Sequence, residues 1–132
     1  MKIMVCYENF KGSENIMRVA IQQAKALDAA VHLVTVLIVS TLDEERCTKK
    51  AQEELNKAKE SLEIEGVACK AHILIRGVSE GEDLLRFAEI NGMDEIIIGA
   101  KKRSKLEKMI LGSATQTVIL QAHCPVITVK AA

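Results

Sequence analysis

The stretch DEIIIGAKKRSKLEKMILGSATQTVILQAHCPVITV, residues 94–129, decides the fold and contains the candidate site. Its apolar run at 96–98 predicts a strand that is buried on both faces and ended by Gly99. A loop rich in Lys and Arg follows. Ser113 then caps an apolar periodic segment, and Gln116, three residues later, completes a capping box. A last short strand is predicted at 126–129, after Pro125. This order of a strand, a basic loop, a glycine and a capped helix is typical of a site where a helix N-terminus meets an anion.

The rest of the chain alternates in the same way. β-Branched runs predict strands at 2–8, 31–39 and 67–75, and apolar residues at steps of three and four predict helices at about 13–27, 41–65 and 79–90. Ser79 with Glu82, and Thr41 with Glu44, form further capping boxes. Alternation without a linker predicts a single α/β domain over residues 1–132. Its core is a doubly wound five-stranded parallel sheet with strand order 3-2-1-4-5 and helices on both faces.

Composition restricts the classes of partner. The 132 residues carry 18 basic and 18 acidic side chains and only three aromatic ones, which argues against nucleic acid and against a charged membrane surface. No apolar run reaches membrane length. The four cysteines and three histidines show no metal-ligand spacing, and free core-type cysteines are expected in a reducing cytoplasm. The sequence therefore predicts a cytoplasmic protein with neither a zinc site nor a disulfide framework.

In such a sheet, ligands bind beyond the carboxyl ends of the strands where the strand order reverses, here between the first and fourth strands. The carboxyl ends of the predicted strands at this point carry Glu8, Val36 and Gly99, and we expect Gly112 and Ser113 to lie beside them. Taken alone, a glycine at a strand end, a helix cap or a charge run has a structural explanation. Together they favour a phosphate site, with a basic cluster nearby: Lys101, Lys102, Arg103, Lys105 and Lys108. A Walker A loop, a GxGxxG fingerprint and a nucleophile elbow do not occur.

These residues resemble the universal stress protein family in its ATP-binding branch. The run from Gly99 through Gly112 and Ser113 is similar to the G-x2-G-x9-G-S/T signature of that family. The closing HCPVITV at 123–129, GSEN at 12–15 and RGVSEGEDLL at 76–85 extend the resemblance over the whole chain.

The resemblance implies a set of ligand contacts. Ribose and phosphates would meet Gly99, Lys102, Gly112, Ser113, Ala114 and Thr115, Val36 would pack on adenine, and Glu8 would lie near the ribose. The ligand would be ATP, with or without Mg²⁺, and the protein would form a homodimer through Val126 to Val129.

Two positions depart from the family pattern. Lys102 stands where the signature has its second glycine, and the turn after Glu8 contains the additional residues 9–11. A lysine at that position allows neither positive φ nor close backbone approach to phosphate at low cost. Both departures lie in segments that the resemblance places next to the nucleotide.

The leading hypothesis is a stress-response regulatory protein that binds ATP and turns it over slowly or not at all, because no general base or carboxylate pair is evident beside the glycines. One alternative is a dimeric stress protein that binds no nucleotide and acts through a protein partner that the sequence does not identify. A slow ATPase or phosphotransferase is the third hypothesis, with Glu8 as its candidate acid or base.

Overall fold

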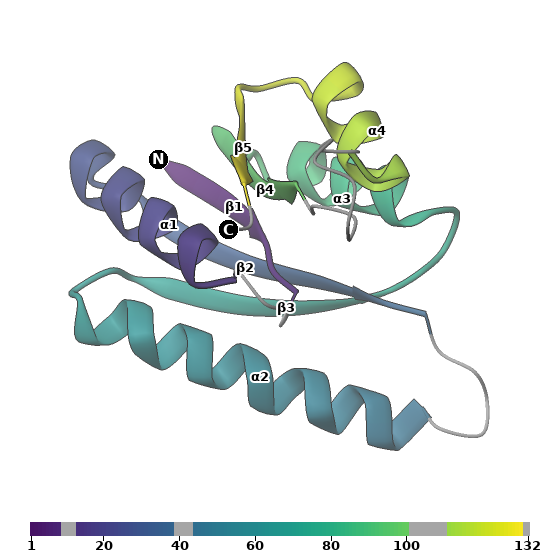
Figure 1. The fold of residues 1–132 in the computed structure, drawn as a ribbon, viewed down its shortest axis with the longest axis horizontal. Coiled ribbons are helices and arrows are strands. Elements are labelled where there is room, and N and C mark those ends of the chain that lie inside the picture. The colour runs from purple at the N-terminus through teal and green to yellow at the C-terminus, as the bar shows by residue number, and fades with distance from the viewer. Residues whose placement is uncertain (9–12, 39–43, 101–110, 131–132) are drawn as a thin grey trace, which may run out of the picture.

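A computed structural model describes residues 1–8, 13–38, 44–100 and 111–130. Five parallel strands form one sheet in the order β3-β2-β1-β4-β5, which confirms the predicted topology (Figure 1). The elements in chain order are β1 Lys2–Cys6, α1 Ser13–Leu27, β2 Ala30–Leu37, α2 Glu44–Ile64, β3 Cys69–Ile75, α3 Glu80–Ile90, β4 Glu95–Ala100, α4 Ser113–Gln121 and β5 Val126–Lys130.

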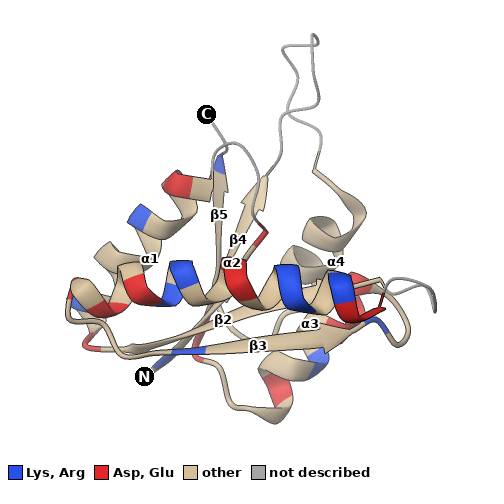
Figure 2. Ribbon diagram, turned by 90° about the horizontal axis from the view of Figure 1, so that it is seen from below, with Lys and Arg blue, Asp and Glu red and all other residues tan. Residues whose placement is uncertain are grey.

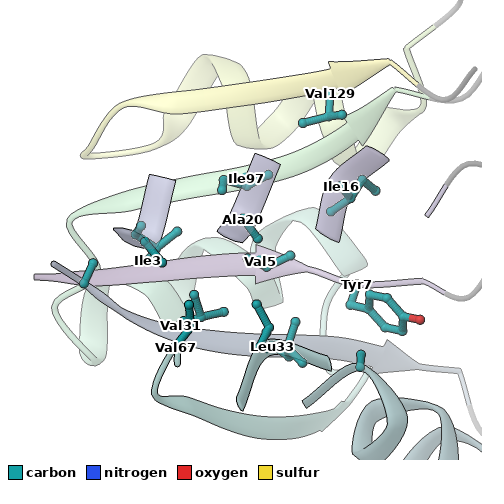
Figure 3. Close-up of a cluster of buried hydrophobic side chains, with 14 of the residues drawn as sticks. Ile3, Val5, Tyr7, Ile16, Ala20, Val31, Leu33, Val67, Ile97 and Val129 are labelled. Carbon is teal, nitrogen blue, oxygen red and sulfur yellow. The ribbon is translucent and has the colours of Figure 1, made fainter. Parts of the chain in front are cut away.

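Helices cover both faces of the sheet and produce two cores. On one face, α1 and α2 pack over alternate residues of the strands, and Ile3, Val5 and Tyr7 follow one another along the first strand and past its end (Figure 3). On the other face, α3 and α4 pack over the remaining alternate residues, including Met4 and Ile96. The central strands are buried from both sides because their side chains alternate between the two cores.

The long helix α2 keeps only a narrow stripe buried, at Ala51, Leu55, Ala58 and Leu62. Basic and acidic residues occupy much of the rest of its surface (Figure 2). This arrangement agrees with a solvated outer face. None of the described helices is long and apolar enough to span a membrane.

Two local predictions are wrong. Gly99 does not end the fourth strand, because β4 continues to Ala100 and pairs with β5 at Gly99–Val129 and Ala100–Lys130. Ser113 does not cap the last helix: Gly112 is the N-cap residue, and no side chain makes a capping hydrogen bond. The Gln116 side chain instead donates to the carbonyl of Leu111 at 2.9 Å.

The cap predicted for α3 is confirmed. Ser79 has extended backbone angles, and its hydroxyl accepts a hydrogen bond from the Glu82 amide at 3.2 Å. Gly66 and Gly92 follow the ends of α2 and α3 with positive φ, as expected for glycines that terminate helices. The cap predicted at Thr41 lies outside the described residues.

Candidate functional site

The site lies where β1 and β4 separate. These two strands pair only from Ile3–Glu95 to Val5–Ile97. Beyond that point β1 stays with β2, and the Tyr7 amide donates to the Val34 carbonyl at 2.9 Å. β4 stays with β5 as far as Ala100. The chain continues from β1 to α1 on one face of the sheet, whereas α4, which follows β4, lies on the other face. A cleft of about 310 Å³ opens between the carboxyl ends of the two strands.

One end of the cleft is apolar. Val34 and Val36 contribute from β2, Ile98 from β4 and Leu84 from α3. Cys6, buried on β1, also lines this region. Burial, followed by the nearby carboxylates of Glu80 and Glu8, raises the pKa of the Cys6 thiol. The thiol therefore stays protonated at neutral pH and is not an activated nucleophile.

The other end of the cleft is formed by the N-terminus of α4, with Gly112, Ser113, Ala114 and Thr115 along the wall. The first amides of any α-helix have no partner within the helix. In α4 the cap residue is a glycine without a side-chain oxygen. The positive end of the helix dipole and these amides therefore suit an anion in the cleft.

The protein itself does not require a glycine at position 112. Its φ of −64° is open to any residue. A Cβ built there would meet no atom within 4 Å. What glycine provides is clearance in front of the helix, so that a ligand could approach the backbone closely.

Thr115 connects the two glycine segments of the site. Its side chain is buried, and its hydroxyl donates to the Gly99 carbonyl at 3.2 Å. This hydrogen bond holds the first turn of α4 against the end of β4. The hydroxyl oxygen can still accept a hydrogen bond, so the tether does not prevent contact with a ligand.

The structure brings most residues of the predicted site into this one cleft: Glu8, Val36, Gly99, Gly112, Ser113, Ala114 and Thr115. Lys102 lies outside the described residues. Sequence reasoning missed other lining residues: Cys6, Tyr7, Val34, Glu80, Leu84 and Ile98. Among these, only Glu80 and Leu84 carried a usable signal, because they are four residues apart on a predicted helix that begins at the same end of the sheet.

Within the described parts of the chain, no three His, Cys, Asp or Glu side chains gather to hold a metal ion. The arrangement is therefore that of a small-molecule cleft with an apolar end and an anion-binding end. Its volume of about 310 Å³ falls at the lower end of the range of about 300–1,000 Å³ that is usual for such sites.

Comparison with known proteins identifies the same family that the sequence motifs resemble. The family model described as the universal stress protein family matches residues 1–130. Universal stress protein MJ0531 of Methanocaldococcus jannaschii is 34% identical over 140 residues, which cover 98% of this chain and 81% of that protein.

Two solved structures from Archaeoglobus fulgidus share the fold. One universal stress protein aligns with a TM-score of 0.85 and 29% identity, over 98% of this chain and 97% of its own. Another, solved in complex with dAMP, aligns with a TM-score of 0.79 and 26% identity, over 98% and 96% of the two chains. This chain therefore belongs to the universal stress protein family.

Proposed function

We propose that this stress protein binds an adenine nucleotide, and specifically ATP, in the cleft between β1 and β4. The observation that carries the proposal is the N-terminus of α4, which begins with Gly112 and has no side-chain cap at the end of a cleft whose other end is apolar. A related protein that is 26% identical binds dAMP, a ligand of the same class. The cytoplasmic location predicted from the sequence is part of this proposal.

The two ends of the cleft match the two ends of a nucleotide. The base packs against Val36 and Leu84, and the ribose lies near Glu8. The phosphates accept hydrogen bonds from the backbone at Gly112 and Ser113, where the helix dipole favours negative charge. Mg²⁺, when it accompanies ATP, would be held chiefly by the phosphates and by water, as is common for this ion.

The protein acts as a regulator and not as a fast enzyme. Phosphoryl transfer requires a group that orients the attacking water or hydroxyl and charges that stabilise the transferred phosphoryl. Cys6 is protonated, which leaves Glu8 as the acid or base candidate at the β1 tip. Hydrolysis should therefore be slow, and inorganic phosphate release from labelled ATP measures it directly. Turnover on the scale of about one per second or faster would favour the enzyme hypothesis.

The homodimer through β5 is the second part of the proposal. β5 is an edge strand, since its described neighbour in the sheet is β4 alone. Ile127 is half-buried against the α1–α2 core. The Ile96 amide donates to the Pro125 carbonyl in the parallel ladder, so the backbone of Ile127 faces β4 and that of its neighbours Val126 and Thr128 faces the open edge. An unpaired edge of β-branched residues is suited to pairing with the same strand of a second copy.

Native mass spectrometry tests both parts together. The protein is mixed with equal amounts of AMP, ATP and GTP, and masses are recorded under conditions that preserve complexes. We expect a dimer carrying one adenine nucleotide per chain, with little GTP adduct. A dimer with no adduct at millimolar nucleotide would instead favour the hypothesis of a dimeric stress protein that acts through protein contacts alone.

A further inference from the structure

Glu80 lines the cleft beside its apolar wall and close to the first turn of α4, which the neighbouring Gly81 approaches. Glu80 is the first residue of α3 and lies one turn before Leu84 on the same face of that helix. Leu84 is fully buried and lines the apolar end of the cleft. Residues four apart on a helix are neighbours, so the Glu80 side chain stands beside the apolar wall against which a base would pack.

The backbone around Glu80 is fixed from both sides. The Asp83 carboxylate accepts hydrogen bonds from the amides of Gly77 at 2.8 Å and Val78 at 3.3 Å. Ser79 caps the helix through the Glu82 amide. These contacts hold the β3–α3 turn in place, so that Glu80 starts from a well-defined position at the rim of the cleft.

The Glu80 carboxylate interacts electrostatically with the Cys6 thiol, and both residues line the cleft. After burial, Glu80 is the largest contributor to the raised pKa of the Cys6 thiol, ahead of Glu8. Cys6 and Glu8 belong to the β1 end, whereas Glu80 belongs to α3. The cleft is therefore lined by two acidic residues from different elements: Glu8, which follows β1, and Glu80, which begins α3.

The apolar wall cannot by itself distinguish one purine from another. Adenine and hypoxanthine have nearly the same shape and stacking surface, and a hydrophobic pocket discriminates weakly between molecules of equal size. They differ at two neighbouring positions of one edge: adenine carries an exocyclic amine beside an unprotonated ring nitrogen, and hypoxanthine carries a carbonyl beside a ring N–H. A carboxylate accepts a hydrogen bond from the amine and repels the carbonyl oxygen. Only a carboxylate that faces the exocyclic group, and not the ring nitrogen, therefore prefers adenine.

We propose that Glu80 selects the base, because its carboxylate accepts a hydrogen bond from the exocyclic amine of adenine. The inference rests on the proposed function and adds to it the residue that makes the cleft specific for adenine. Glu80 is thus a specificity-determining residue, and the phosphate end of the cleft does not contribute to this choice.

The test compares AMP with IMP, which differ only along that edge of the base and share the ribose and the phosphate. Both are titrated by calorimetry into the wild type, into Glu80→Ala and into the matched control Glu82→Ala. Glu82 carries the same charge in the same helical turn, but its side chain is exposed and lies outside the cleft lining. The control therefore reports any effect of removing a carboxylate from the start of α3.

We expect the wild type and Glu82→Ala to prefer AMP by about tenfold or more, as for a hydrogen bond to a charged group. In Glu80→Ala the preference should fall to within about threefold, and IMP should bind more tightly than it does to the wild type, since the repulsion is gone. An AMP preference that survives in Glu80→Ala would overturn the assignment, as would tighter binding of GMP than of AMP to the wild type. If the wild type binds AMP and IMP equally well, the inference fails and the proposed function stands. If the wild type binds neither, both fail.

Discussion

Substituting Gly81 with alanine tests the close contact that places α4. A Cβ at position 81 would lie 2.8 Å from the Thr117 Cβ and 3.3 Å from the Ala114 Cα, both on α4. The first distance is well short of the roughly 3.5–4.0 Å at which carbon atoms pack, so α4 must move away from α3. Such overpacking costs about 1–3 kcal/mol. Alanine returns up to about 1 kcal/mol through its better helix propensity. We therefore expect a net loss of about 1 kcal/mol in the free energy of unfolding, or about 3–5 °C in Tm.

The same substitution should weaken nucleotide binding, because Ala114 belongs to the first turn of α4 that lines the cleft. Urea unfolding measures the stability, and calorimetric titration with AMP and adenosine measures the affinity. Gly77→Ala is the matched control, since its Cβ would meet the Asp83 carboxylate at an ordinary 3.4 Å. We expect AMP affinity to fall severalfold in Gly81→Ala and adenosine affinity to change less. A Gly81→Ala protein as stable as the wild type, with unchanged AMP affinity, would refute this account of how α3 positions α4.

Four further substitutions make separate predictions. Gly112→Val should keep its fold, since a Cβ at that position meets nothing within 4 Å. It should lose ATP binding, because the side chain blocks access to the amides at the start of α4. Unaltered ATP affinity would show that Gly112 is not part of the site. Ile127→Pro removes a backbone donor that pairs β5 with β4, so β5 should no longer be held as an ordered edge strand and the protein should be monomeric or insoluble. A soluble, unchanged dimer by light scattering would place the interface elsewhere. Lys102→Gly should tighten ATP binding and leave adenosine binding almost unchanged, because glycine permits close approach of the backbone to phosphate; selective weakening of ATP would identify Lys102 as a phosphate ligand. Glu95 is 9% exposed, and burial raises the pKa of its carboxyl. Its contribution to stability is therefore present below the pKa of the unfolded chain and lost as the pH rises through the raised pKa of the folded state. The stability of Glu95→Gln relative to wild type should accordingly increase from acidic to neutral pH, and parallel stability curves would contradict this.

The alternation of elements could be predicted because each one satisfies its local rule. The strands are runs of β-branched residues, and the helices carry apolar residues at helical spacing. Five strands with helices between them leave few topologies, and right-handed crossovers restrict these further. The predicted order β3-β2-β1-β4-β5 is one of the few that these rules allow, and the structure confirms it. This order determines which strand ends lie together where the strand order reverses, so the residues at those ends could be predicted as well.

The two wrong details of the last segment have local causes. Gly99 resembles a strand terminator in isolation, but its backbone pairs with β5, and this tertiary pairing outweighs the weak strand preference of glycine. Gly112 and Ser113 are both acceptable N-cap residues, so the cap could not be assigned to one of them from composition. The backbone angles decide in favour of Gly112, with ψ at 160°. The consequence is functional, since the helix starts without a capping oxygen.

The α3 wall of the cleft could be predicted only in part. The spacing of Glu80 and Leu84 places them on one face of a predicted helix, but whether that face reaches the cleft depends on how α3 and α4 pack over the sheet. Gly81 permits a close approach of the two helices, and that approach places Glu80 and Leu84 at the cleft. A single glycine in a predicted helix indicates neither its neighbour nor the distance. The packing of helices distant in sequence is a property of the whole fold.

The most direct measurement of the central claim is a calorimetric titration of the wild-type protein with ATP, AMP and adenosine under the same conditions. The anion-binding end at Gly112 and Ser113 predicts one ligand per chain, with each phosphorylated ligand binding more tightly than adenosine. Because the helix amides act on charge, the difference between AMP and adenosine should shrink as salt is raised. No binding of any of the three ligands, or adenosine binding as tightly as ATP and AMP, would contradict the claim that the N-terminus of α4 is a phosphate site.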